Sequence, residues 1–258
     1  MNTTNTRFEL IVKRDCETCQ LAQPIYREMQ ERGLALTIYT QDDPDFPTHV
    51  TDLVDDRELQ HSFQRQIEIV PTLIRLEDGK EAGRTYGWDR SEWQNLTGLN
   101  NLGDDLPPFQ PGCGSLSTEP ARAETLELKY SDIGISARNI EVDASLDDIE
   151  ACYERGWSDG LPVVPPTPLR VLRMLKGTSR KPEEVLGQVP PGNAVCTVEK
   201  VAINAVMAGC LPEYLPVVIT AIEAVLEPVF SMHGVLATTD IAGPIVVING
   251  PIAKRIGM

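Results

Sequence analysis

The chain has 258 residues, enough for two domains of ordinary size. Hydrophobic residues make up 41% and charged residues 24% of the chain, so it can bury a core and is not expected to be disordered. Lys and Arg number 23 against 38 Asp and Glu, which gives a net charge of −15. This charge argues against binding to nucleic acid and to anionic membranes.

No apolar stretch approaches the roughly 18–20 residues that span a bilayer. The first residues also lack the basic and then apolar order of a secretory signal. We therefore expect a cytoplasmic protein without a membrane partner. Six cysteines in 258 residues are too dilute for a disulfide scaffold, and among them Cys16 and Cys19 form the one closely spaced pair.

The first hundred residues predict a small α/β domain. The patterns typical of strands cover residues 8–13, 34–40, 68–76 and 81–86. The patterns typical of helices cover residues 20–32, 53–66 and 89–96. This order places Cys16 and Cys19 between the first strand and the first helix.

The position of the cysteine pair has chemical consequences. A thiol at the start of a helix lies near unpaired N–H groups and the positive end of the helix dipole, which lower its pKa from roughly 8.5. Two intervening residues allow the second thiol to reach the first and resolve a mixed disulfide. The pattern therefore predicts Cys16 as the attacking thiolate and Cys19 as the resolving thiol. Two other readings remain: the pair binds a metal, although it supplies half the ligands of a structural zinc site, or it is incidental.

Residues 7–98 resemble a thioredoxin or glutaredoxin-like domain. The matches are Cys16-Glu17-Thr18-Cys19 between strand and helix, Pro24 after it, and Val70-Pro71-Thr72 at the opening of a strand. The resemblance implies a thioredoxin-like fold with a cis peptide bond at Pro71. It also implies that these three residues, Val70, Pro71 and Thr72, form the edge that binds a thiol or peptide substrate.

The sequence departs from that family at several positions. Asp15 precedes the pair where thioredoxins usually carry Trp, and Glu17 adds a second negative neighbour. The buried acid that serves thioredoxins as a proton relay would fall at Leu10. These departures leave the redox potential open.

Residues 99–119 are rich in Gly, Pro, Asn and Asp, so we expect a linker between two domains. Within this linker Cys113 lies between two glycines, where a thiol has little cover and can approach a partner closely. We consider two roles for Cys113: a third redox thiol, serving Cys16 and Cys19 or a second active site, and an ordinary loop cysteine.

Residues 120–258 predict a second, larger α/β domain of unknown activity. The expected helices are 146–155, 169–176, 197–209 and 216–226, and the expected buried strand is 244–250. A proline-rich rigid turn at 157–168 contains Asp159, which either lines a substrate pocket or caps the turn.

The segments 157–168 and 197–223 also resemble an uncharacterised bacterial family in which a thioredoxin-like domain precedes a longer α/β domain. That resemblance brings no activity. It implies that the second domain is incomplete at Met258 and is completed by further residues, a second chain or a homo-oligomer.

The sequence therefore predicts a thiol–disulfide oxidoreductase that needs no cofactor and no metal and acts on a thiol or disulfide partner or a small molecule. Its catalytic residues would be Cys16, Cys19 and Cys113, coupled to a second catalytic domain. One alternative is a protein that binds a soft metal or organometal through its thiolates. Another is a lyase or hydrolase that uses Asp159, Glu199 or His233, with the first domain for docking.

Overall fold

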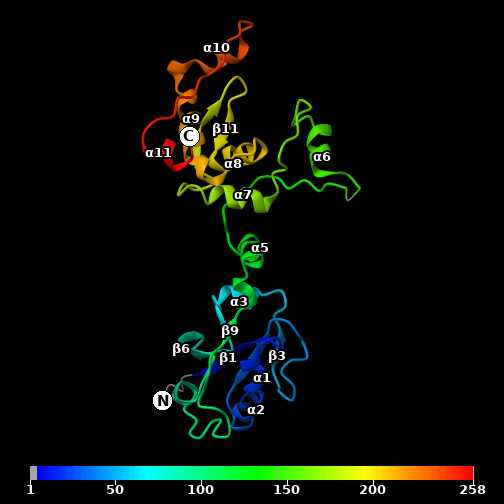
Figure 1. Ribbon diagram of the computed structural model, residues 1–258, viewed down its shortest axis with the longest axis vertical. Helices are drawn as coiled ribbons and strands as arrows, with labels where there is room; N and C mark the ends of the chain where they lie inside the picture. The colour runs from blue at the N-terminus through cyan, green and yellow to red at the C-terminus, as the bar shows by residue number, and fades with distance from the viewer. Residues whose placement is uncertain (1–4, 144, 258) are drawn as a thin grey trace. The chain divides into compact units, whose positions relative to one another are not determined.

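The computed structural model describes residues 5–143 and 145–257 (Figure 1). The chain has a mixed α/β fold, as the sequence predicts. It divides into two compact units, Met1–Ser131 and Asp132–Met258.

The first unit is built on a five-stranded mixed sheet with the strand order β3-β2-β1-β5-β6. Its strands are β1 (Thr6–Val12), β2 (Leu36–Thr40), β3 (Leu53–Asp55), β5 (Thr72–Glu77) and β6 (Lys80–Tyr86). β1 pairs in parallel with β2 and antiparallel with β5, and β5 pairs antiparallel with β6. Because β1 lies in the middle and is covered on both faces, its residues Leu10, Ile11 and Val12 are all fully buried.

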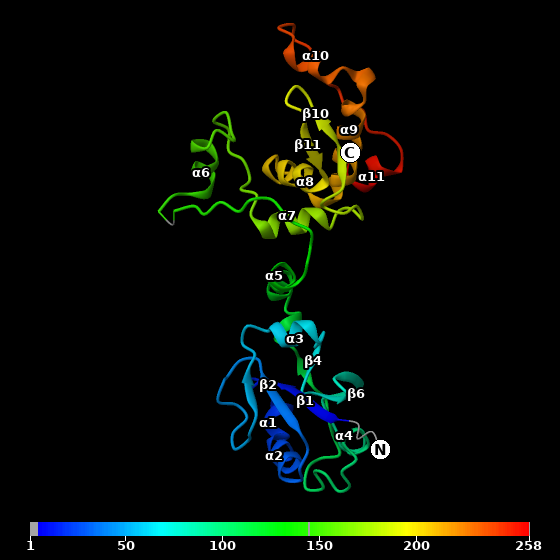
Figure 2. The same cartoon turned by 180° about the vertical axis from the view of Figure 1, so that it is seen from behind.

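The helices of the first unit follow and connect these strands, and the last of them packs on the third helix rather than on the sheet (Figures 1 and 2). They are α1 (Glu17–Leu21), α2 (Gln23–Glu31), α3 (Gln60–Gln64), α4 (Arg90–Thr97) and α5 (Pro120–Tyr130), with a 3-10 turn η1 (Leu116–Thr118). The start of α4 is fixed by the Asp89 side chain, which accepts a hydrogen bond from Glu92 N. Its end is fixed by Gly98 in the left-handed conformation.

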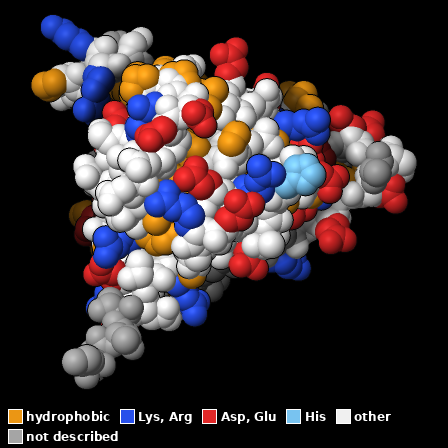
Figure 3. All heavy atoms as spheres, turned by 90° about the horizontal axis from the view of Figure 1, so that it is seen from below, with side chains coloured by type: hydrophobic (Ala, Val, Ile, Leu, Met, Phe, Trp, Pro, Cys, Tyr) orange, Lys and Arg blue, Asp and Glu red, His pale blue; other side chains and the backbone are white. Residues whose placement is uncertain are grey.

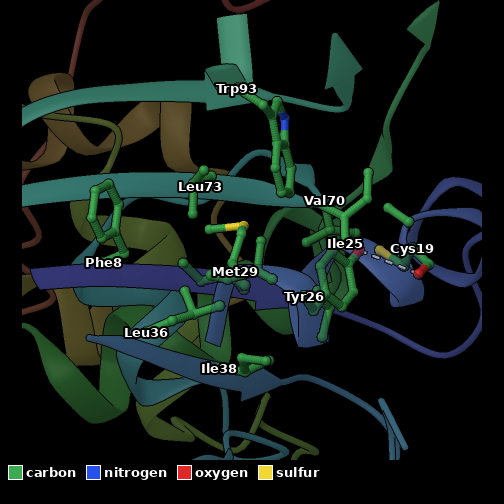
Figure 4. Close-up of a cluster of buried hydrophobic side chains, with 14 of the residues drawn as sticks. Phe8, Cys19, Ile25, Tyr26, Met29, Leu36, Ile38, Val70, Leu73 and Trp93 are labelled. Carbon is green, nitrogen blue, oxygen red and sulfur yellow. Dashed lines mark hydrogen bonds between the residues drawn. The ribbon is translucent and has the colours of Figure 1, made fainter. Parts of the chain in front are cut away.

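The core of the first unit lies between the sheet and its helices (Figure 4). Ile25, Tyr26 and Met29 of α2 are buried at the spacing of one helix face. Trp93 of α4 is fully buried and meets the Trp88 ring edge-on, with centroids 5.3 Å apart.

Two expected elements of the first unit differ in the structure. Instead of one helix over 53–66, the chain forms β3 and the short α3, because Leu59 between them adopts the left-handed conformation with φ 57°. Instead of one strand over 68–76, the chain forms β4 (Ile69–Val70) and β5, which are separated by Pro71. The Val70–Pro71 peptide bond is cis, as the resemblance implies.

The segment 99–119 differs from the linker that its composition predicts, because it packs on the first unit. Its strand β8 (Phe109–Gln110) pairs with β7 (Trp88–Asp89), and its strand β9 (Cys113–Gly114) pairs with β4. Leu102 is fully buried, and Trp88 Nε1 donates to Pro107 O at 2.7 Å. The division between the units falls after Ser131 rather than within 99–119.

The second unit combines helices with one β-hairpin. Its strands are β10 (Val185–Val189) and β11 (Ala194–Thr197). Its helices are α6 (Asp148–Glu154), α7 (Pro168–Leu175), α8 (Val198–Met207), α9 (Leu215–Leu226), α10 (Met232–Ala237) and α11 (Pro251–Arg255), with 3-10 turns η2 (Pro212–Tyr214) and η3 (Pro228–Phe230). The core of the unit gathers buried aliphatic side chains of α7, α8 and α9, among them Val171, Ala202 and Ile219. Thr197 caps α8 as predicted, since its side chain accepts from Lys200 N.

The buried strand expected over 244–250 is wrong. The segment is irregular, and the side chains of Ile245 and Val247 are 89% and 79% exposed. The physical reason is pairing: within residues 145–257 the only sheet is the two-stranded β10–β11 hairpin, which offers this segment no partner strand.

The surface mixes both signs of charge, and Figure 3 shows acidic and basic side chains interspersed on the face that it views. In the described part of the chain no single helix is long and apolar enough to cross a membrane. One pair of helical segments, Pro212–Leu226 and Pro228–Ala237, passes that test together by length and composition alone, with a bend of 70° between them.

The burial of β1 leads to a stability prediction. Leu10→Ala removes a fully buried side chain and should lower the free energy of unfolding of the first unit by about 2–5 kcal/mol. Denaturant unfolding followed by fluorescence in a Trp157→Phe background measures this unit, because the remaining Trp88 and Trp93 both belong to it. The control is Val54→Ala on β3, where the side chain is 39% exposed and the change should stay within about 0.5 kcal/mol. Equal losses in the two variants would contradict the burial assigned to Leu10.

Candidate functional site

Cys16 and Cys19 lie at the junction of β1 and α1. Cys16 is the N-cap of α1, and its sulfur accepts a hydrogen bond from Cys19 N at 3.4 Å. Cys16 is 3% exposed and Cys19 is fully buried. The Tyr26 hydroxyl donates to the carbonyl oxygen of Cys19 at 3.2 Å, which ties the pair to α2 (Figure 4).

The predicted substrate edge, Val70-Pro71-Thr72, lies beside Cys16. The Cys16 thiol reaches the carbonyl oxygen of Val70 at 3.5 Å. Thr72 is buried, and its hydroxyl donates across Pro71 to Ile69 O at 2.6 Å. These contacts hold the backbone before β5 in one conformation next to the thiol.

Cys113 joins the pair to make a cluster of three thiols. In the β4–β9 ladder Cys113 pairs with Val70, and Gly114 pairs with Ile69. This register places the Cys113 side chain close enough to Cys16 for each thiol to shift the pKa of the other. The structure thus brings together all three cysteines that the sequence singles out.

The three thiols have different acidities. Hydrogen bonding from the Cys19 side chain, supported by Cys113 and by the backbone N–H groups of Cys19 and Thr18, lowers the pKa of Cys16 to about 5 against the effect of burial. Burial raises the pKa of Cys19 well above its ordinary value, and the neighbouring Cys16 raises it further. Burial and the hydrogen bond to Cys16 also raise the pKa of Cys113. Near neutral pH the cluster therefore holds one thiolate, on Cys16, between two protonated neighbours.

A buried polar network fixes the segment that carries Cys113. Gln41 Nε2 donates to Ser115 Oγ at 2.7 Å and to Ser62 Oγ at 2.8 Å, and Gln41 Oε1 accepts from Leu116 N at 3.1 Å. Ser117 Oγ donates to the carbonyl oxygen of Ile67 at 2.7 Å. These polar residues carry no periodic signal in the sequence, so their shared network is not predicted from it.

Gly112 packs closely against Ile69 and Val70 of β4. A Cβ atom on Gly112 would lie 2.3 Å from Ile69 Cγ2 and 2.8 Å from Val70 O, closer than real Cβ atoms approach. A side chain at position 112 would therefore force the segment away from Ile69 and Val70, which explains why glycine precedes Cys113.

The structure also shows the surroundings of Asp15, Glu17 and Leu10, the residues at which the sequence departs from the thioredoxin pattern. Asp15 and Glu17 are exposed, so water and salt screen their charges from the buried Cys16 sulfur. Leu10 is fully buried in the apolar core and offers no proton relay. The low pKa of Cys16 therefore depends mainly on hydrogen bonds from its neighbours rather than on a charged partner.

The three candidates in the second unit, Asp159, Glu199 and His233, lie in different surroundings. Asp159 is exposed, and its carboxylate accepts from Leu161 N at 3.4 Å within the turn. Glu199 is 3% exposed and accepts hydrogen bonds from Ser136 N, Ser136 Oγ and Ala137 N at 2.9, 3.0 and 2.7 Å. Glu199 therefore anchors the segment before α6. His233 is exposed on α10.

The remaining cysteines belong to the second unit. Cys152 is buried on α6, and burial raises its pKa. Cys196 and Cys210 both line an apolar cavity of about 630 Å³ between the hairpin and helices α8 and α9. Among residues 5–143 and 145–257, no group of three or more His, Cys, Asp and Glu side chains is arranged to hold a metal ion.

No protein-family description and no curated protein matches the sequence. Similar solved structures include the reduced thioredoxin pre-protein of Schistosoma mansoni, with 15% identity over 38% of this chain and 80% of that one and a TM-score of 0.28. StoA from Bacillus subtilis is 12% identical over 37% of this chain and 83% of that one, with a TM-score of 0.29. A thioredoxin of Malassezia sympodialis is 15% identical over 36% of this chain and 72% of that one, with a TM-score of 0.25.

These neighbours are thioredoxin-like, and they match the N-terminal part of the chain. The mixed sheet of the first unit and the position of Cys16 and Cys19 between β1 and α1 agree with the fold expected from the sequence. The family resemblance of segments 157–168 and 197–223 stays a prediction.

The acidity of Cys16 can be measured directly. The thiolate absorbance near 240 nm, taken as the difference between the reduced protein and Cys16→Ser, should titrate near pH 5. Cys19→Ala should raise this midpoint more than Cys113→Ala, because the Cys19 hydrogen bond is the larger cause. As a control, the difference between the protein and Cys152→Ser should titrate above the ordinary thiol range. A Cys16 midpoint near the ordinary value of about 8.5 would contradict the arrangement.

The same shift predicts a pH dependence of stability. The folded-state pKa of Cys16 is lowered, so between about pH 5 and about pH 8.5 the unfolded chain binds more protons at this group than the folded chain. The contribution of Cys16 is therefore fully present above about pH 8.5 and is lost as the pH falls toward 5. The free energy of unfolding of the reduced protein, minus that of Cys16→Ser, should rise from pH 5 to pH 8. A flat difference over this range would contradict the shift.

Proposed function

We propose that the first unit is a thiol–disulfide oxidoreductase in which Cys16 attacks and Cys19 resolves. The observation that carries the proposal is the geometry of the pair: Cys16 is the N-cap of α1, and its sulfur accepts a hydrogen bond from Cys19 N at 3.4 Å beside the buried Cys19 side chain. A low-pKa thiolate is the reactive form in disulfide exchange, and the second thiol is within contact distance to complete it.

The reaction runs in two exchanges. The Cys16 thiolate attacks a disulfide RSSR′, forms Cys16–S–S–R and expels R′S⁻. Cys19 then gives up its proton to the departing thiolate R′S⁻ and attacks the Cys16 sulfur, which forms the Cys16–Cys19 disulfide and expels RS⁻. Two electrons pass from the two cysteines to RSSR′, and the reverse sequence oxidises an outside thiol.

The burial of Cys19 supports its assigned role. A fully buried thiol with a raised pKa is a poor first nucleophile, because little of it is ionised and outside disulfides do not reach it. It becomes effective once Cys16 carries the mixed disulfide beside it. The backbone of Val70, Pro71 and Thr72 lies beside the Cys16 sulfur at which the mixed disulfide forms.

The proposal also covers the partner of the first unit and the activity of the second unit. The partner would be a thiol or disulfide compound, and the second unit would carry a further activity on a substrate of unknown class. Asp159 stays a proposed substrate contact of that second unit, while its hydrogen bond to Leu161 supports the simpler role of a turn cap.

A turnover assay with cysteine variants distinguishes the attacking cysteine from the resolving one. Cys16→Ser should abolish dithiol-driven reduction of a disulfide, because the attacking thiolate is absent. Cys19→Ser, combined with Cys113→Ser to remove the neighbouring thiol, should accumulate a mixed disulfide on the protein, detected by mass spectrometry, because the resolving thiol is absent. Cys152→Ser, in the second unit, serves as the matched control and should keep the turnover of the unmodified protein. Unchanged turnover of Cys16→Ser would overturn the proposed function.

A further inference from the structure

The three thiols differ in their access to solvent. Cys16 is 3% exposed and Cys19 is fully buried, whereas Cys113 is partly exposed. Of the three, Cys113 is therefore the thiol that an outside molecule meets first. An attack on Cys16 would require the segment over it to move.

The strand edge beside Cys16 is already occupied. An extended peptide binds to a sheet by pairing its backbone with a free strand edge. Here β9 fills that position, with Val70 opposite Cys113 and Ile69 opposite Gly114, and Ser115 N donates to Glu68 O at 2.9 Å. The chain thus supplies its own extended segment, with a cysteine at the position opposite Val70.

This segment is held at both ends. Before Cys113, the Thr18 hydroxyl donates to Pro111 O, and Gly112 lies against Ile69 and Val70 without room for a Cβ atom. After Cys113, the Gln41 side chain binds Ser115 and the backbone of Leu116 in the buried network. Fixed contacts on both sides distinguish this segment from a loop that crosses the site by chance.

We infer that residues 109–118 occupy the place of an extended peptide substrate, so that Cys113 is the entry thiol of the site and its substrates are low-molecular-weight disulfides rather than unfolded polypeptides. The inference rests on the proposed function, since it names the route and the substrate class of the same thiol exchange.

The relay needs three exchanges. Cys113 passes its proton to the adjacent Cys16 sulfur, attacks a small disulfide RSSR, forms Cys113–S–S–R and expels RS⁻. This RS⁻ takes the proton from Cys16 to become RSH and leaves Cys16 as the thiolate. The Cys16 thiolate then attacks the Cys113 sulfur and expels the second RS⁻. Finally Cys19 attacks the Cys16 sulfur, forms the Cys16–Cys19 disulfide, and its proton restores the Cys113 thiol. The net change is a two-electron oxidation of Cys16 and Cys19 by RSSR.

The order of the relay follows from access and from leaving-group chemistry. In thiol exchange the more accessible sulfur is attacked and the thiol of lower pKa leaves faster. In a Cys16–Cys113 disulfide the accessible sulfur belongs to Cys113, and Cys16 has the lower pKa. An outside thiolate would therefore attack Cys113 and release Cys16, which is the reverse of the second step above.

The test is single-turnover oxidation of the reduced full chain by bis(2-hydroxyethyl) disulfide, with acid quenching and mapping of cysteine adducts by mass spectrometry. In Cys16→Ser, assayed at alkaline pH because the proton acceptor of Cys113 is missing, the hydroxyethylthio adduct should accumulate on Cys113. In Cys113→Ser formation of the Cys16–Cys19 disulfide should slow about tenfold or more, because the entry thiol is missing. Cys210→Ser is the control for loss of a partly exposed thiol and should react as the unmodified protein does.

Two outcomes overturn the inference in different ways. If Cys113→Ser forms the Cys16–Cys19 disulfide at the unmodified rate, with the first adduct on Cys16, the entry role of Cys113 is wrong while the proposed function stands. If the unmodified protein forms no Cys16–Cys19 disulfide, the proposed function fails and the inference fails with it.

A separate experiment tests the proposed substrate class. Gly112→Ala should push the segment away from Ile69 and Val70, and should raise the rate of reaction with the disulfide of an extended cysteine-containing peptide by about tenfold. Gly114→Ala is the matched control, since a Cβ atom there meets nothing within 4 Å, and its peptide rate should not change. Thermal unfolding of both variants checks that each remains folded. If the unmodified protein already reduces the peptide disulfide as fast as bis(2-hydroxyethyl) disulfide, the restriction to small disulfides is overturned.

Discussion

The pairing of Cys113 with Val70 is the contact on which the thiol site depends. It places a third sulfur against Cys16, closes the strand edge next to Pro71 and covers the reactive pair. Each of these effects needs the same short ladder, which is held by Gly112 on one side and by the network around Gln41 on the other. A change that releases the ladder would therefore alter the acidity of Cys16 and the access to it together, and with them the substrate class that we propose.

The acidity of Cys16 shows how a buried group can be charged without an ionic partner. Burial alone would disfavour the thiolate. Here thiol and N–H donors surround the sulfur, and in a site with little water such hydrogen bonds are stronger than in solution. The protons that stabilise Cys16 are the protons that Cys19 and Cys113 retain, so the three acidities form one linked system.

The sequence predicted the parts of the fold and the site that have local signals. The Cys16–Cys19 spacing, the strand before it and the helix after it follow from short patterns. The place of residues 99–119 could not be predicted, because Gly, Pro and Asn are equally typical of a free linker and of a loop packed on a domain. The role of Gln41 could not be predicted, because a single buried amide leaves no periodic pattern in the sequence. The strand predicted over residues 244–250 is wrong, because an apolar run does not reveal whether a partner strand exists.

The fixed position of Cys113 also makes it compete with outside thiols for reaction with Cys16. A thiol held in contact with Cys16 has an effective concentration set by geometry, on the order of millimolar or higher for groups joined by a short chain. Any outside thiol that forms a mixed disulfide with Cys16 must compete with this neighbour, whatever the thiol concentration of the surroundings. A mixed disulfide on Cys16 would therefore exchange with Cys113 at least as readily as with a millimolar thiol in solution.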